Sequence, residues 1–145
     1  MKNKAFSIIE VLVIVGIIGI FALFAVPAYR LFQPSLQLNG AVRELITDLR
    51  YIQQMAVTEQ VEYCIKFFPS EKRYQVIECE SVSPIKEVVL SDKIKTLILS
   101  GFSSNEVRYN PYGAVREEGQ ITLENTKNET KTILVKSSGF VKVSD

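Results

Sequence analysis

Few side chains in this 145-residue chain have the types and spacing that catalysis requires. The chain has no histidine, the commonest general base and metal ligand of proteins. Two carboxylate pairs, Glu78 with Glu80 and Glu117 with Glu118, lie where we expect exposed strand or loop. The sequence contains no Gly-x-Ser-x-Gly motif of a nucleophilic serine, no phosphate-binding loop and no metal-ligand spacing. The sequence therefore predicts no enzyme, no metal site and no cofactor.

The two cysteines, Cys64 and Cys79, are the next candidates for chemistry. Two cysteines alone do not make a zinc site, but an oxidising compartment would permit a disulfide between them. We expect them on adjacent strands, so the register decides the question. If Pro69 faces Tyr74, Cys64 faces Cys79, whereas a shift of one residue places Cys64 opposite Glu78. The second register gives the better apolar face, and both stay open.

Glu10 is a carboxylate inside an apolar stretch that continues to Val26. About 20 helical residues cross a hydrocarbon core of roughly 30 Å, so this stretch can span a membrane. A carboxylate costs on the order of 2–3 kcal/mol at the centre of a span and less near its end, and a cationic partner would offset that cost. Lys2 and Lys4 precede the stretch and favour a cytoplasmic N-terminus.

The segment Ala5-Phe6-Ser7-Ile8-Ile9-Glu10 with the apolar run behind it resembles the N-terminal methylation motif of type IV prepilins and pseudopilins. Pro27 matches the proline near the end of that run, and Ala5 stands where the family usually has glycine. The resemblance implies that a membrane peptidase cuts between Ala5 and Phe6 and methylates the new amino group of Phe6. It also implies that Glu10 pairs with this amine on a neighbouring subunit and so acts in assembly.

One long helix should carry these residues and continue beyond the membrane. Pro27 and Pro34 predict a kink or a loosened segment within it. Beyond them, apolar residues recur at three- and four-residue steps to about Glu59, which predicts an amphipathic helix. This apolar face consists of Leu38, Val42, Leu45, Ile46, Leu49, Ile52 and Ala56. We assign Arg43, Glu44, Thr47, Asp48 and Arg50 to a solvated face.

From Val61 onward the apolar period changes to two, which predicts β-strands. The expected strands are 61–68, 74–80, 86–90, 94–99, 106–109, 120–124, 130–136 and 140–143. We interpret them as a meander of antiparallel hairpins, giving a pilin-like α+β fold with a long helix packed on a β-sheet domain. The predicted parts are a leader (1–5), a membrane or filament-core helix (6–29), its amphipathic half (30–59) and the β domain (60–145).

The rest of the chain resembles the GspH/FimT branch of pseudopilins. The resemblance rests on Ala41-Val42-Arg43-Glu44-Leu45, on the segment from Val107 to Gly113, and on Gly139-Phe140-Val141-Lys142-Val143. It implies a minor subunit that helps to initiate or cap a type IV pilus or a type II secretion pseudopilus. Implied partners are other pilins, prepilin peptidase and an inner-membrane assembly platform. The implied location is the bacterial inner membrane, single-pass with the C-terminal domain in the periplasm, and then the filament.

DNA binding is the alternative function, because some minor pilins of this branch are thought to bind DNA through a basic C-terminal segment. Lys131, Lys136 and Lys142 are the candidate contacts here. Phosphate binding needs such cations on one face. The C-terminal segment contains no arginine and ends on Asp145, and the net charge of the chain is only +1. These observations favour the structural role over a DNA-binding subunit of a competence pilus.

Overall fold

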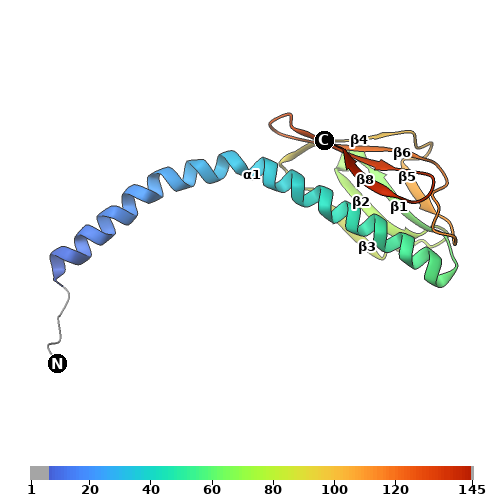
Figure 1. The fold of residues 1–145 in the computed structure, drawn as a ribbon, viewed down its shortest axis with the longest axis horizontal. Helices are drawn as coiled ribbons and strands as arrows, with labels where there is room; N and C mark the ends of the chain where they lie inside the picture. Colours follow the sequence, from blue (N-terminus) through green and yellow to red (C-terminus); the bar gives the residue numbers. More distant parts are fainter. Residues whose placement is uncertain (1–6, 145) are drawn as a thin grey trace, which may run out of the picture. The chain divides into compact units, whose positions relative to one another are not determined.

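The computed structural model describes residues 7–144, which form one long helix followed by a β domain (Figure 1). The helix α1 extends from Ile8 to Glu59 and passes through Pro27 and Pro34 without a break. The later elements are β1 (Tyr63–Phe68), the 3-10 turn η1 (Pro69–Glu71), β2 (Arg73–Glu78), β3 (Lys86–Val89), β4 (Ile94–Ser100), β5 (Glu106–Tyr109), β6 (Gly119–Asn125), β7 (Thr130–Val135) and β8 (Val141–Ser144). Each predicted strand overlaps an observed strand.

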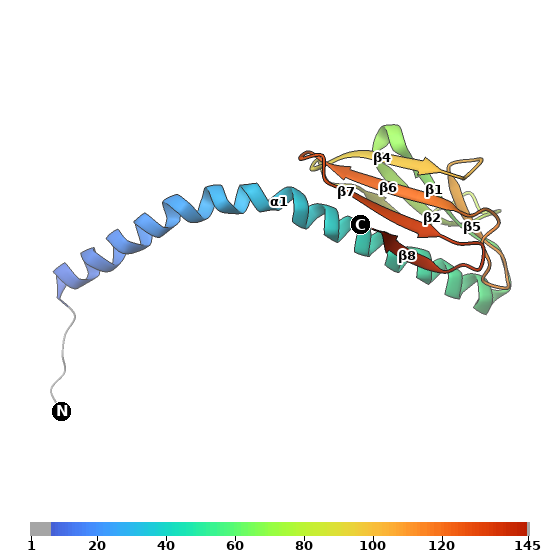
Figure 2. The same cartoon turned by 45° about the horizontal axis from the view of Figure 1, so that its top comes forward.

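The strands form two four-stranded antiparallel sheets rather than one meander. The first sheet has the order β3-β2-β1-β5, and the second has the order β4-β6-β7-β8. Figure 2 shows the four strands of the second sheet side by side. The predicted meander is therefore wrong, because β4 leaves the first sheet, β5 returns to pair with β1, and β6 pairs with β4. Turn residues determine where a chain reverses, but they do not determine pairing between strands distant in sequence.

The C-terminal part of α1 packs on this β domain through the predicted apolar face. Leu38, Val42, Leu45, Leu49 and Ile52 are all buried. They belong to one core with strand residues of both sheets, among them Ile65, Val76, Ile121, Leu123 and Ile133. Burying one such side chain contributes roughly 1.5–3 kcal/mol, so the helix and both sheets stabilise one another. The predicted α+β architecture, a long helix packed on an antiparallel β domain, is confirmed.

The chain divides between Gln33 and Pro34 into two units. In the first unit the structure describes Ser7 and the N-terminal part of α1. The second unit contains the rest of α1 and both sheets. Only the second unit has a hydrophobic core among the residues described.

Candidate assembly site

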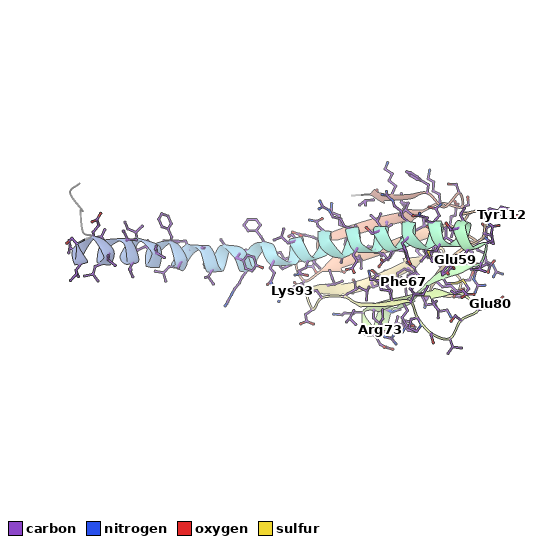
Figure 3. The ribbon with its side chains drawn as sticks, turned by 90° about the horizontal axis from the view of Figure 1, so that it is seen from below. Glu59, Phe67, Arg73, Glu80, Lys93 and Tyr112 are labelled. Carbon is purple, nitrogen blue, oxygen red and sulfur yellow. A yellow bond between two sulfur atoms is a disulfide. The ribbon has the colours of Figure 1, made fainter. Side chains whose placement is uncertain are left out.

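The N-terminal part of α1 is an apolar helix without a cover. From Ile8 to Phe32 every residue is exposed, and Figure 3 shows side chains projecting above and below the helix. Phe21 and Phe24 are 69% and 71% exposed. Within residues 7–144, α1 is the one helix that is long and apolar enough to cross a membrane. An apolar surface of this size is unfavourable in water, so it must be covered by lipid or by other protein.

Glu10 lies in the first turn of α1, and its side chain is exposed. It is the only charged residue between Ser7 and Tyr29. The unpaired N–H groups of a helix N-terminus carry a partial positive charge, which favours a carboxylate at this position. Arg30, the nearest cation after it in the described chain, lies 20 residues further along the helix, so a charge partner would have to come from elsewhere. The predicted cleavage site at Ala5 and Phe6, and the predicted N-methylation of Phe6, lie outside the described residues.

Pro27 and Pro34 each remove one backbone hydrogen bond from α1. A proline has no N–H, so the carbonyls of Leu23 and Arg30, four residues earlier, lose their helical donors. The helix nevertheless continues through both positions. The kink at Pro27 stays a prediction.

Cys64 and Cys79 are joined by a disulfide, with a Cα–Cα separation of 5.2 Å. Both registers considered from the sequence are wrong, because the ladder places Cys64 opposite Ile77. Cys79 follows two residues later and donates its N–H to the Glu62 carbonyl at 2.9 Å. The two cysteines are thus diagonal neighbours on one face, which brings them close without a directly opposed pair. The disulfide fixes the start of the β2–β3 connection against β1.

Replacing Cys64 and Cys79 together by serine is expected to lower the free energy of unfolding by about 3 kcal/mol, since the bond closes a loop with a sequence separation of 15. Chemical denaturation of the whole chain in detergent measures the change. The matched control is the wild-type chain with and without reductant: reduction should reproduce the loss in the wild type and leave the double variant unchanged. Equal stability of the two proteins under oxidising conditions would contradict the expectation.

Lys131, Lys136 and Lys142 do not share one face of the second sheet. Lys142 of β8 lies opposite Leu134 of β7, so these two side chains share one face of the sheet. On β7, Lys131 lies on the same side as the buried Ile133 and Val135, which follow at every second position, so it starts from the other face. Lys136 follows the end of β7. Alternate residues of a strand point to opposite faces, so Lys131 and Lys142 point in different directions. The fold does not gather these three cations into a phosphate-binding stripe.

A buried polar cluster around Asp48 was not predicted from the sequence. Asp48 is buried, so its assignment to the solvated face of the helix is wrong. It accepts hydrogen bonds from the Tyr74 hydroxyl at 2.7 Å and from Lys86 Nζ at 2.9 Å, and Lys86 also binds Glu44. These contacts join α1 to β2 and β3. The available signal was the position of Asp48 between the buried Leu45 and Leu49, at the margin of the apolar face.

The electrostatics of this cluster follow from burial and charge pairing. Burial, and then the hydrogen bond to Asp48, raise the pKa of the Tyr74 hydroxyl. Burial lowers the pKa of Lys86, but hydrogen bonds to the Asp48 and Glu44 carboxylates outweigh it and leave that pKa raised. Tyr74 therefore stays neutral and Lys86 stays charged at ordinary pH. The cluster is a fixed link between helix and sheet.

Asp48→Ala is expected to lower the free energy of unfolding by about 2–3 kcal/mol, because it leaves the buried Tyr74 hydroxyl without an acceptor. Thermal and denaturant unfolding give the measurement. Glu44→Ala is the control, because the Glu44–Lys86 pair is exposed and should contribute less than about 1 kcal/mol. Similar losses in the two variants would show that Asp48 is not the anchor of the cluster.

The C-terminal end of α1 is held by two tight loops. Gln53 donates from Nε2 to the Gly113 carbonyl at 2.8 Å. Gly113 and Gly139 both have left-handed backbone angles, with φ of 78° and 83°. A Cβ at Gly139 would overlap the Gly113 carbonyl oxygen and the Gln53 amide. This position therefore requires glycine, and the contact connects α1 to the β7–β8 turn.

Comparisons with known proteins relate this chain to GspH and to minor subunits of pili and pseudopili. The family model of GspH, a type II transport protein, matches residues 41–139. The crystal structure of the type IV minor pilin FimU of Pseudomonas aeruginosa superposes with a TM-score of 0.63 at 14% identity, covering 79% of this chain and 92% of FimU. The minor pseudopilin EpsH of the Vibrio cholerae type 2 secretion system gives a TM-score of 0.61 at 8% identity, covering 74% and 96%. No curated protein sequence matches.

Proposed function

Because the chain belongs to the GspH family of type II transport proteins, we infer that it is a structural minor subunit of a type IV pilus or a type II secretion pseudopilus. The observation that carries this inference is α1 itself. Its N-terminal part is apolar and exposed on all sides, whereas its C-terminal part belongs to the core of the β domain. One helix thus supplies a surface for other molecules and a connection to a folded domain.

The apolar part of α1 has two successive environments in this proposal. Before assembly, lipid covers the segment from Ile8 to Tyr29, which is long enough for a single span. After assembly, helices of other pilin subunits replace the lipid. The change costs little hydrophobic free energy, because both environments are apolar, so packing and polar contacts must determine which subunits associate.

Glu10 is the polar contact that we assign to assembly. Cleavage before Phe6 would create a cationic amine four residues from Glu10 in the sequence. A carboxylate and an amine are each costly within lipid, and a pair between neighbouring subunits offsets both costs. Prepilin peptidase, which would cut between Ala5 and Phe6, and an inner-membrane platform are the proposed processing and assembly partners. The proposed orientation has a cytoplasmic N-terminus and a periplasmic β domain, as Lys2 and Lys4 favour.

DNA binding gains no support from the family match or from the two structural likenesses. Lys131 and Lys142 lie on opposite faces of their sheet, which removes the geometric basis of that alternative. We therefore propose the structural role alone.

Fractionation of cells that make the filament tests this function. The chain is expected in the inner membrane when the peptidase gene is deleted, and additionally in sheared or purified filaments when it is present. A filament fraction from cells lacking the assembly platform is the control for membrane contamination. A chain that never enters filaments, although the platform and peptidase are active, would contradict the proposed function.

A further inference from the structure

A groove lies in the second unit between α1 and the edge strand β3. Its cavity volume is about 490 Å³. Leu36, Gly40 and Ala41 line it from α1, and Val88, Val89 and Leu90 line it from β3 and the residue after it. Leu36 and Val89 are 60% and 69% exposed, so each rim of the groove presents an open apolar side chain. Gln37, Glu44 and Ser91 add polar groups to the lining. A largely apolar depression with a few polar groups is a common seat for an amphipathic or apolar helix.

Gly40 is not explained by contacts within the chain. A Cβ at this position would meet nothing within 4 Å, and the backbone there is ordinary α-helix. Glycine is among the least favourable residues in a helix interior, and alanine would fit without strain. Gly139, by contrast, has a clear internal reason to be glycine. A small residue in an exposed helix permits close approach of another backbone, so Gly40 points to a partner molecule over the groove.

The exposed apolar part of α1 indicates which kind of molecule binds in the groove. The groove begins at Leu36, only four residues after Phe32, the last residue of the fully exposed apolar helix. When subunits assemble through such helices, the apolar helix of one subunit lies beside α1 of the next subunit. Gly16 and Gly19 in that helix would also accept a Cβ with nothing within 4 Å of it, so the helix can approach closely. The occupant expected from continuity is therefore an apolar helix, not a separate soluble protein.

We propose that the groove between α1 and β3 seats the apolar N-terminal helix of a neighbouring pilin subunit, with Gly40 at the point of closest approach. The proposal rests on the proposed function and adds the site of contact. An added β-strand is the less suitable occupant, because Lys86 and Glu87 occupy the short edge strand β3 and charged edges disfavour strand addition. The groove thus fixes how far along α1 the next subunit is placed.

Photo-crosslinking in cells tests the contact directly. A benzoylphenylalanine residue is placed at Leu36 or at Val89 of the full chain, and filaments are irradiated and digested. Mass spectrometry is expected to find adducts with the apolar N-terminal helix of another pilin subunit. The control is the same residue at Val82, which is 95% exposed in the β2–β3 connection and does not line the groove. Adducts with a β domain alone, or none at the groove positions, would overturn the proposal.

Substitution of Gly40 gives a second test in which folding and docking change in opposite directions. Gly40→Leu fills the groove and is expected to reduce the amount of the chain in filaments about tenfold. The midpoint of thermal unfolding should rise by about 3 °C, because leucine is the better helix former. Gln54→Leu is the control, since it adds the same side chain at an exposed position of α1 that does not line the groove. Wild-type incorporation of Gly40→Leu would overturn the proposal.

Different results would contradict the proposed function and the proposed groove contact. If the wild-type chain never enters filaments, the proposed function fails and the groove has no neighbour to bind. If the chain enters filaments but the groove positions give no adduct with an apolar helix, only the groove assignment fails. The filament fraction of the wild-type chain is therefore measured in every experiment.

Discussion

Glu10→Ala is expected to leave the chain processed and inserted in the membrane but to reduce its amount in filaments by about tenfold or more. The reason is the charge left behind. Without Glu10, the amine of Phe6 on the neighbouring subunit has no partner in an apolar environment. Membrane insertion should persist, since removing a carboxylate makes the helix more apolar.

Quantitative immunoblots of the membrane and filament fractions measure the effect of Glu10→Ala. Glu118→Ala is the matched control, because Glu118 is an exposed carboxylate of the β domain far from α1 in sequence. Glu10→Asp separates charge from reach and should retain more incorporation than alanine. Incorporation of Glu10→Ala at the wild-type level would remove the role that we give to this carboxylate.

Gly139→Ala should produce the largest loss of stability of any single methyl added to the β domain, about 3 kcal/mol or more. Two independent costs contribute. Alanine is unfavourable at a φ of 83°, and its Cβ would overlap the carbonyl oxygen of Gly113 and the amide of Gln53. The contact that is lost holds the end of α1, so the helix and the second sheet should both loosen.

Thermal unfolding of the detergent-solubilised chain measures this loss, which corresponds to a midpoint lower by about 10 °C. Gly40→Ala is the control, because it adds the same methyl group to open space and should raise the midpoint slightly. A midpoint for Gly139→Ala within about 2 °C of wild type, the shift expected for roughly 0.5 kcal/mol, would contradict the account of the loop contact.

Local patterns in the sequence predicted the elements well. The three- and four-residue steps of Leu38, Val42 and Leu45 identified the buried face of α1, and each is buried as expected. Alternation of apolar and polar residues located the strands because each strand has one face in the core. These signals are local, so they need no knowledge of which elements meet.

Pairing between distant parts could not be predicted in the same way. The predicted register of the hairpin is wrong because Pro69 begins the short turn η1, which places Cys64 opposite Ile77. The pairing of β5 with β1 was not predicted, because many residues separate the two strands and no turn connects them directly. A one-residue shift or a strand exchange changes few local preferences, yet it changes every long-range contact.

Asp48 shows a third limit of sequence reasoning. A carboxylate between polar residues such as Thr47 and Arg50 is normally solvated. Here Tyr74 and Lys86, from two different strands, supply its hydrogen bonds. Those partners are 26 and 38 residues away, so no local pattern indicates them. The apolar helix and Glu10, by contrast, were recognisable because their unusual feature is contained in one segment.

The mature N-terminus of the chain in purified filaments tests the central claim most directly. Filaments are sheared from cells, the chain is isolated, and intact-mass and N-terminal peptide mass spectrometry are performed on the same sample. The proposed role in assembly predicts a chain that begins at Phe6 with a methylated amine. A chain in filaments that still begins at Met1 would contradict it.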